Sequence, residues 1–470
     1  MITTHKERKA KLPPPKNVKR AVAAALLAAI SAAALTGMAG PAHAAGKAPA
    51  AAGSQGRLVP TAAGSQGRLV PAAAGSQGRL VPAAAGYRGR LVSATPLRTL
   101  PDKAAVAAEL TADGFSAASV RYGVRSYRLV YQTVSATGLP TTASGLLVLP
   151  IGGPRRLSVV SFTHGTEVYR GDAPSRQPRG FEPDPAYTYA SAGFAAAAPD
   201  YLGMGTGPGT HPWMDVPSET TATLDMLRAA RSYITDHGRV LRRQVLATGF
   251  SQGASAALGL GRALQDGASR WFRLGALAPV SGAYDLRGVE LPAILSGELV
   301  RLNPRPKVGA KYSVLYAAYG MVAFDRLHPF YRTPAAVFKP PYDGTIFRLL
   351  NSYHPAQQVL AGTPGTLPQL LTARGFALLR HPAGGLATEL RIDDSVCDWA
   401  PAAPIRLYMA TRDEQAVNAN TWHCQAGFAD RHLRVPVVNL GTPSYQGSRH
   451  LGSNVAGTAR IVRWFLRLTR

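Results

Sequence analysis

The sequence predicts an α/β fold in which helices cover both faces of a mostly parallel central sheet. Three observations predict it. From about residue 100, segments typical of strands alternate with segments typical of helices. Some of the strand segments, such as "LGALAPV", are apolar throughout, as strands buried on both faces are. One serine stands between two glycines where a predicted strand meets a predicted helix, in "VLATGFSQGASAALGL".

The amino-terminal residues have the pattern of a secretory signal peptide. Residues 1–20 contain five lysines and two arginines, an uncharged alanine-rich run follows them, and Ala42-His43-Ala44 offers a small-residue cleavage site. The apolar run is short and weakly hydrophobic for a membrane anchor, which is the alternative. We therefore expect residues 1–44 to be removed and the mature protein to be secreted, outside the cell or in its envelope.

A repeat follows the predicted signal peptide. "AAGSQGRLVP" begins at Ala51, Ala62 and Ala73, and a degraded copy, "AAGYRGRLVS", begins at Ala84. Two glycines in each copy and a final proline or serine oppose a helix. We interpret residues 45–92 as a low-complexity linker and residues 93–470 as the folded domain.

The elements of the domain are expected in this order. "AAVAAELTADGF" is a helix, "YRLVYQTV" and "ASGLLVLP" are strands, and "LSVVSFTHGT" is a strand with its loop. A helix, a strand and a longer helix follow in "DPAYTYASAG", "FAAAAPDYLGMG" and "SETTATLDMLRAARSYITD". The alternation breaks at about residue 285, because residues 285–394 contain helical segments but no clear βαβ unit. It resumes with "APIRLYMATRDE" and "LRVPVVNLG" and closes with the helix "VAGTARIVRWFLRLTR".

Gly249-Phe250-Ser251-Gln252-Gly253 is a G-x-S-x-G sequence between a predicted strand and a predicted helix. This is the context of a nucleophile elbow, a tight turn that needs small residues two positions before and after the serine. The turn raises the hydroxyl above the sheet edge. Ser251 is therefore the candidate nucleophile.

A serine nucleophile needs a base and an acid, in the order serine, acid, histidine for this type of fold. Asp413 follows the strand "IRLYMA", and His450 follows the strand "RVPVVNLG" on a predicted loop before the last helix. Both lie at carboxyl ends of strands, where open α/β sheets bind ligands. Glu414 is a rival acid, and His423 and His432 fit the position of the base less well.

The oxyanion of an acyl-transfer intermediate needs backbone donors. The residue after the nucleophile, Gln252, should supply one. The second should come from the loop after an earlier strand, either "FTHGTE" with Thr166 or "PDYLGMG" with Asp200. His164 either contacts the site or braces its loop.

In order, "VVSFTHGT", "PDYLGMGTGPGTHPW", "ATGFSQGA", "ATRDEQAV" and "GSRHLG" resemble the secretory lipase family of α/β-hydrolases, which includes fungal lipases of the A type and bacterial secreted esterases. The resemblance covers roughly residues 89–470. It implies an α/β-hydrolase fold, hydrolysis of acyl esters with Ser251, Asp413 and His450 as the triad, and a helical cap at residues 285–394. It also places Asp200 at the oxyanion hole.

The resemblance implies an ester or lipid substrate. We expect no cofactor and no metal, because no cluster of His, Asp, Glu and Cys residues has the spacing of metal ligands. Apolar cap residues that could line an acyl pocket, or simply form the core of the cap, are Leu315, Tyr316, Tyr319, Met321, Phe324, Phe330 and Phe338. Cys397 and Cys424 flank the strand that carries the acid, which is consistent with a disulfide, although two reduced thiols would have the same sequence.

Other functions remain open at this stage. The same triad serves acyltransferases and peptidases, because the pocket selects the acceptor and the leaving group. A non-catalytic envelope-binding protein is a remote alternative. The formal net charge is +26, but the arginines are spread along the chain without interleaved aromatics, which argues against nucleic acid. The charge favours only nonspecific attraction to a lipid interface or the cell envelope. We expect a monomer.

Overall fold

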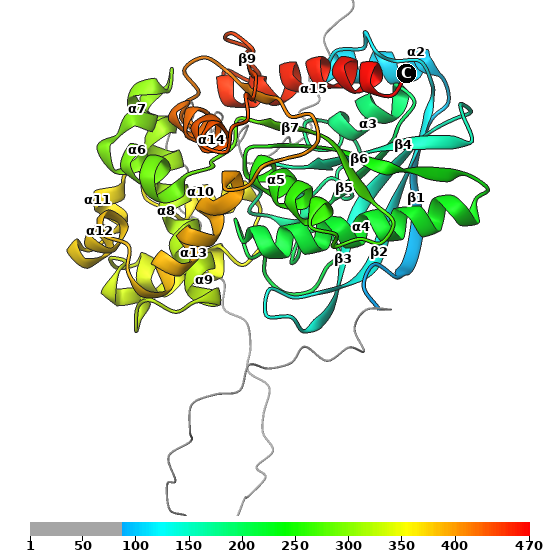
Figure 1. Cartoon of the computed structure of the whole chain (residues 1–470). Helices are drawn as coiled ribbons and strands as arrows, with labels where there is room; N and C mark the ends of the chain where they lie inside the picture. Colours follow the sequence, from blue (N-terminus) through cyan, green and yellow to red (C-terminus); the bar gives the residue numbers. More distant parts are fainter. Residues whose placement is uncertain (1–86) are drawn as a thin grey trace, which may run out of the picture.

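The computed structural model describes residues 87–470, which form a nine-stranded sheet with helices on both faces (Figure 1). The predicted signal peptide and residues 45–86 of the predicted linker lie outside the described residues. The strands are β1 (Leu91–Leu100), β2 (Val124–Val134), β3 (Pro140–Pro150), β4 (Arg156–Thr163), β5 (Ala195–Pro199), β6 (Val240–Phe250), β7 (Arg273–Val280), β8 (Leu407–Met409) and β9 (Val437–Asn439).

The strand order in the sheet is β1-β2-β3-β5-β4-β6-β7-β8-β9. The pairs β1–β2, β2–β3 and β3–β5 are antiparallel, and every pair from β5 to β9 is parallel. The parallel strands therefore end together, and β4, β6 and β8 direct their following loops to one edge of the sheet. The α/β fold class predicted from the sequence is confirmed.

Two helical layers cover the sheet. α4 (Val216–Asp236) and α5 (Gln252–Gln265) pack on one face, and α3 (Asp184–Ser191) and α15 (Arg449–Leu468) pack on the other. Neighbouring residues of β4 show the division, because Val159 belongs to the hydrophobic core under α4 and α5 and Val160 to the core under α3 and α15. Burial on both faces explains why the inner parts of the central strands are rich in apolar residues.

The amino-terminal boundary of the domain differs from the predicted one. Leu91 and Val92, which the sequence places in the linker, belong to β1. Hydrogen bonds from Gly89 N–H to the Gln132 carbonyl and from Gln132 N–H to the Arg90 carbonyl bring this segment onto β2. Residues 89–93 of the last repeat copy therefore lie along β2, and this pairing satisfies their backbone groups.

The chain between β7 and β8 is helical and forms the body beside the sheet at the left of Figure 1. It begins with a π-helical turn, η3 (Leu286–Glu290). It continues through α6 (Leu291–Ser296), α7 (Glu298–Leu302), α8 (Pro306–Leu327), α9 (Tyr342–Leu349), α10 (Ala356–Ala361), α11 (Leu367–Leu370), α12 (Ala373–Arg380) and α13 (Gly384–Asp394).

A disulfide closes the end of this helical segment. Cys397, in the 3₁₀ turn η5 (Ser395–Cys397), is bonded to Cys424 in α14 (Ala419–Ala429), and their Cα atoms are 5.3 Å apart. The bond holds the end of the segment against the helix that follows β8. The alternative of two reduced thiols does not apply to this structure.

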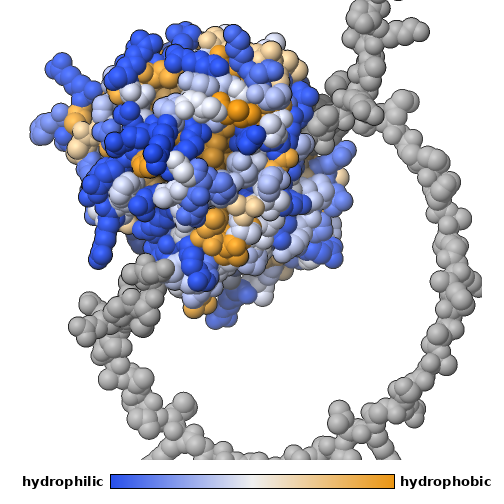
Figure 2. Space-filling view, turned by 90° about the vertical axis from the view of Figure 1, so that its right-hand side faces the viewer, coloured by the Kyte–Doolittle hydropathy of each residue, from blue (hydrophilic) through white to orange (hydrophobic). Residues whose placement is uncertain are grey.

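The surface is predominantly hydrophilic on the face in Figure 2, and its hydrophobic residues form small separate patches. Within residues 87–470, no helix combines the length and the apolar character needed to cross a membrane.

Candidate active site

Ser251 lies in a strained turn between β6 and α5. Its φ of 56° and ψ of −124° are unusual for a residue with a side chain. A Cβ on Gly253 would lie 2.1 Å from the Thr163 carbonyl oxygen, and one on Gly249 would lie 2.0 Å from the Gly253 carbonyl oxygen. Only glycine fits either position, which is the physical reason for the G-x-S-x-G pattern. The Thr163 hydroxyl donates to the Gly253 carbonyl at 2.6 Å and ties β4 to this turn.

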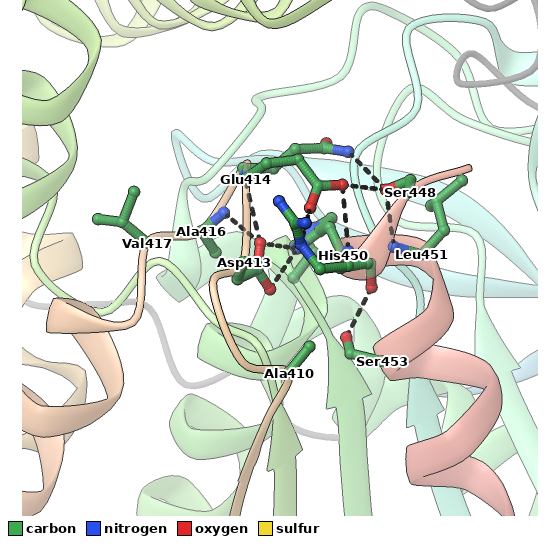
Figure 3. A network of polar contacts seen from close by, with 12 residues as sticks. Ala410, Asp413, Glu414, Ala416, Val417, Ser448, His450, Leu451 and Ser453 are labelled. Atoms are coloured by element: carbon green, nitrogen blue, oxygen red, sulfur yellow. Dashed lines mark hydrogen bonds and ion pairs between the residues drawn. The ribbon is translucent and has the colours of Figure 1, made fainter. Parts of the chain in front are cut away.

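The structure brings the three predicted residues together. The His450 Nε2 lies 2.9 Å from the Ser251 Oγ. The His450 Nδ1 lies 2.9 and 3.0 Å from the two carboxylate oxygens of Asp413 (Figure 3). The Asp413 and His450 side chains are buried, which shields their contact from water.

His450 lies in a helix, not on the predicted loop. α15 begins at Arg449, and its N-cap, Ser448, accepts a hydrogen bond from the Leu451 N–H. The first turn of α15 therefore orients the imidazole. A serine cap immediately before the histidine satisfies a backbone donor that would otherwise be unpaired, which is why the helix begins earlier than its apolar pattern indicates.

Asp413 and Glu414 have different partners. The Asp413 Oδ1 accepts hydrogen bonds from the Gln415 and Ala416 N–H groups at 3.0 and 3.1 Å, which fix the carboxylate toward His450. Glu414 accepts from the Ser448 hydroxyl at 2.5 Å and from the His450 N–H at 3.3 Å (Figure 3). The rival acid thus braces the start of α15, while Asp413 contacts the imidazole.

Thr166 and Gln252 line the cavity beside Ser251. In the described chain, the backbone N–H groups of these two residues have no hydrogen-bond acceptor. The Thr166 hydroxyl accepts from the Trp213 indole at 3.0 Å, which holds the loop in place. Two unpaired donors beside a serine are the arrangement that an oxyanion needs.

Asp200 is not brought to this site, contrary to the expectation from the resemblance. Its N–H donates to the Ser144 carbonyl at 2.9 Å. Its carboxylate accepts from the Ser144 hydroxyl and from the N–H and hydroxyl of Ser175. These bonds hold Asp200 between β3 and the chain before α3, so that neither its backbone nor its side chain is free to bind an oxyanion.

His164 braces its own loop. Its Nδ1 lies 2.8 Å from the Gly165 carbonyl and its Nε2 lies 3.4 Å from the Asp200 carbonyl. Burial lowers the pKa of His164 to about 4, so that the ring is neutral at ordinary pH. Of the other late histidines, His423 pairs with Asp285 at 3.2 Å and His432 is exposed.

The sequence gives no sign of a buried network that anchors Gln252. The Gln252 side-chain Nε2 lies 2.6 Å from the Glu219 Oε1 and 2.9 Å from the His211 Nε2. The His211 Nδ1 lies 3.0 Å from the Leu202 carbonyl, so a neutral ring donates there and accepts from Gln252. Burial raises the pKa of Glu219 to about 8 and lowers that of His211 to about 3. The network ties the first residue of α5 to α4.

An apolar cavity of about 680 Å³ opens beside Ser251. Its walls come from both the sheet edge and the helical segment between β7 and β8. Of the seven apolar residues that the sequence suggests for an acyl pocket, Tyr316, Met321 and Phe324 line it. Its other apolar walls include Trp213, Met214, Leu286, Leu291, Ile294, Leu379, Leu386 and Leu390. Leu315, Tyr319 and Phe338 instead belong to the buried core, and Phe330 packs against it.

A smaller cavity of about 280 Å³ also reaches the nucleophile. Ser251 and His450 line it together with Glu182 and Gln415. Burial raises the pKa of Glu182 to about 8. Ser251 thus lines both cavities. Residues 87–470 contain no group of three or more His, Cys, Asp or Glu side chains placed to hold a metal ion.

Solved structures with this architecture are hydrolases. A protein from Legionella pneumophila, provisionally designated a hydrolase, is 22% identical, with a TM-score of 0.70 over 81% of this chain and 98% of its own. The rice cell wall degrading esterase LipA from Xanthomonas oryzae is 25% identical, with a TM-score of 0.66 over 80% of this chain and 97% of its own. The chain has the α/β-hydrolase fold.

A more distant structural neighbour is Candida antarctica lipase A in its closed state, 15% identical, with a TM-score of 0.53 over 77% of this chain and 79% of its own. No protein-family model and no curated protein sequence matches the chain. The neighbours confirm the resemblance to lipases and esterases that the sequence predicts, and they support ester hydrolysis in general.

Proposed function

We propose that this α/β-hydrolase is a secreted serine esterase of the lipase type, which cleaves carboxylic esters through an acyl-enzyme intermediate. One observation carries the proposal. The Ser251 Oγ, at a strained turn, lies 2.9 Å from the His450 Nε2, whose other ring nitrogen lies 2.9 Å from Asp413. A hydroxyl, an imidazole and a carboxylate in this order can activate a serine at neutral pH.

In the first half-reaction, His450 takes the proton of Ser251 through Nε2 while Oγ forms a bond to the ester carbonyl carbon. The negative charge moves to the carbonyl oxygen, which accepts hydrogen bonds from the Thr166 and Gln252 N–H groups. Asp413 holds the imidazole through Nδ1–H and stabilises its positive charge. When the intermediate collapses, His450 gives its proton to the departing alkoxide, and the acyl group remains on Ser251.

In the second half-reaction, water replaces the alcohol. His450 takes a proton from the water as its oxygen bonds to the acyl carbon, and the same two N–H groups bind the oxyanion. The bond to Ser251 then breaks, and His450 returns the proton to Oγ. The products are the carboxylic acid and the free enzyme.

The two cavities suggest that different parts of the substrate bind in different places. The apolar walls around Ile294, Met321 and Phe324 suit an acyl chain, because burial of each CH₂ contributes about 0.8 kcal/mol. The smaller cavity with Glu182 and Gln415 suits a polar alcohol group or the hydrolytic water. In this proposal the helical segment of residues 285–394 acts as the acyl-binding cap.

Secretion rests on the basic, apolar and small-residue pattern of residues 1–44 and on the disulfide. A bond between Cys397 and Cys424 is favoured in an oxidising compartment outside the cytosol. Amino-terminal sequencing of the protein from culture medium tests this part, and we expect a mature start shortly after Ala44.

The catalytic test compares wild type with Ser251→Ala on p-nitrophenyl esters from acetate to palmitate. We expect kcat/KM to fall about a thousandfold or more in the variant on every ester. Ser255→Ala is the matched control, because this buried serine of α5 donates only to the Ala283 carbonyl and should leave turnover nearly unchanged.

Reaction with a fluorophosphonate identifies the nucleophile independently, and we expect a single covalent label on Ser251. Ester turnover that survives in Ser251→Ala would contradict the proposal. With added glycerol, a product that is mainly a new ester instead of the acid would indicate an acyltransferase.

A further inference from the structure

A third cavity, far from Ser251, is lined by arginines. It has a volume of about 640 Å³ and lies between α15 and the last two strands of the sheet, where its lining residues are Arg406, Tyr408, Val438, Arg460, Arg463 and Arg467. We call it the arginine cleft. Arg460 follows His450 by ten residues in α15, which is about 15 Å along the helix axis. The cleft is therefore separate from the ester site.

The charges of the arginine cleft are not neutralised by the protein. In residues 87–470, none of its four arginines forms an ion pair, whereas Arg449 of the same helix pairs with Glu414 at 3.3 Å. Positive groups that converge on one cavity without a counter-ion raise the local concentration of anions.

Repulsion between three of these arginines destabilises α15. Arg460, Arg463 and Arg467 are three and four residues apart, so they share one face of α15 and repel one another. The helix dipole favours a cation in the last turn, which accounts for Arg467 but not for the other two. An anion bound between them would remove the repulsion.

The fourth arginine comes from the sheet and is held in place. The Arg406 guanidinium lies over the Trp464 ring, 4.8 Å from its centroid. Burial raises the pKa of Tyr408, while the positive charges of Arg406, Arg467 and Arg460 act in the opposite direction. An ordered guanidinium loses less entropy when it binds a ligand.

We propose that the arginine cleft is a binding site for phosphate groups. Guanidinium groups match the oxygens of phosphate with pairs of parallel hydrogen bonds, and Tyr408 also lines the cleft. Four arginines exceed what one phosphate monoester needs, so the cleft suits a ligand with two or more phosphates or a surface that presents several. Such phosphates come either from a soluble polyanion or from anionic lipid headgroups.

The test uses full-length protein and one variant, Arg460→Ala/Arg463→Ala/Arg467→Ala. Pyrophosphate binding is measured by calorimetry at constant ionic strength, and lipid binding by sedimentation with phosphatidylglycerol–phosphatidylcholine vesicles. We expect the variant to bind at least one of the two about tenfold more weakly than wild type. Its ester turnover and thermal midpoint should change little, because the three side chains are exposed and distant from Ser251.

A charge-matched control separates a site from a generally basic surface. Arg125→Ala/Arg156→Ala/Arg242→Ala removes the same charge from exposed arginines elsewhere. If the cleft variant, but not the control variant, loses pyrophosphate binding, the site exists and a soluble phosphate compound is its ligand. If the cleft variant, but not the control variant, loses only vesicle binding, the site exists and a lipid headgroup is its ligand. Equal losses in both variants, or no binding by wild type in either assay, would overturn the proposal.

Arg406→Lys provides a second check that does not change the charge. The lysine cannot reproduce the stacked, forked geometry of the guanidinium, so a built site should lose about threefold or more in affinity. Unchanged affinity would mean that only diffuse charge acts there.

Discussion

Replacing Glu219 by glutamine tests the buried carboxyl that anchors Gln252 beneath the nucleophile elbow. Glu219 is buried in α4, and its Oε1 lies 2.6 Å from the Gln252 Nε2. The new amide oxygen can accept the same hydrogen bond, so the substitution removes the titration and keeps the contact. Its effect on stability should therefore depend on pH.

The sign follows from where the proton is bound. Burial raises the pKa of Glu219 from 4.5 to about 8 in the folded protein. Between these values the unfolded chain ionises and the folded chain stays protonated, so folding takes up a proton and wild-type stability falls as pH rises. Below pH 4.5 both states are protonated, and above about pH 8 both are ionised, so the loss is confined to this window. Each pH unit costs about 1.4 kcal/mol, and from pH 5 to 7 the loss is about 3 kcal/mol.

The assay is urea unfolding of wild type and Glu219→Gln at pH 5 and pH 7. The free energy of unfolding of the variant should gain about 3 kcal/mol over wild type between the two pH values. Comparing the two proteins at each pH cancels the other buried carboxyls, such as Glu182. Ester turnover of the variant should stay within about threefold of wild type, because the anchor of Gln252 is kept. The same difference in stability at both pH values would refute the reasoning.

Three further predictions concern the ester site. Asp413→Asn should lower kcat by about 10³–10⁴-fold with little change in fold, because the amide favours the wrong imidazole tautomer. Steady-state kinetics measures kcat, and circular dichroism checks the fold. A loss of kcat below tenfold would exclude Asp413 as the orienting acid. Gly253→Ala should yield misfolded or inactive protein, since its Cβ would lie 2.1 Å from a β4 carbonyl oxygen. Gly344→Ala is the control and should behave like wild type, because no atom lies within 4 Å of the added Cβ. Equal thermal midpoints of the two variants would argue against the tight elbow. Ile294→Trp should fill part of the apolar cavity and lower kcat/KM on long-chain esters about tenfold or more while sparing acetate; an equal loss on both would place the acyl chain elsewhere.

The order of elements and the nucleophile could be read from the sequence, because both depend on local patterns. Apolar runs between helical segments predict β4 and β6, and the spacing of Gly249, Ser251 and Gly253 predicts the elbow, since only a tight turn excludes side chains at both glycines. Asp413 and His450 follow from their places after strands of a parallel sheet, whose carboxyl ends meet at one edge. The sequence does not predict the pairing of Leu91 with β2, because the first residues of the edge strand β1 lie in the repeat and carry no distinct strand pattern.

The tertiary structure alone decided the surroundings of the site, because those contacts join residues that are far apart in the chain. Glu219 lies 33 residues before Gln252, and Glu414 lies 34 residues before Ser448, with nothing in either segment to mark them as partners. Asp200 shows the converse, since its local motif matches a catalytic family while bonds to Ser144 and Ser175 hold it elsewhere. Hydrophobic periodicity and turn-forming residues predict local structure, because they depend on residues that are close in sequence. Hydrogen bonds between residues of different helices and strands depend on how those elements pack against one another, so only the tertiary structure shows them.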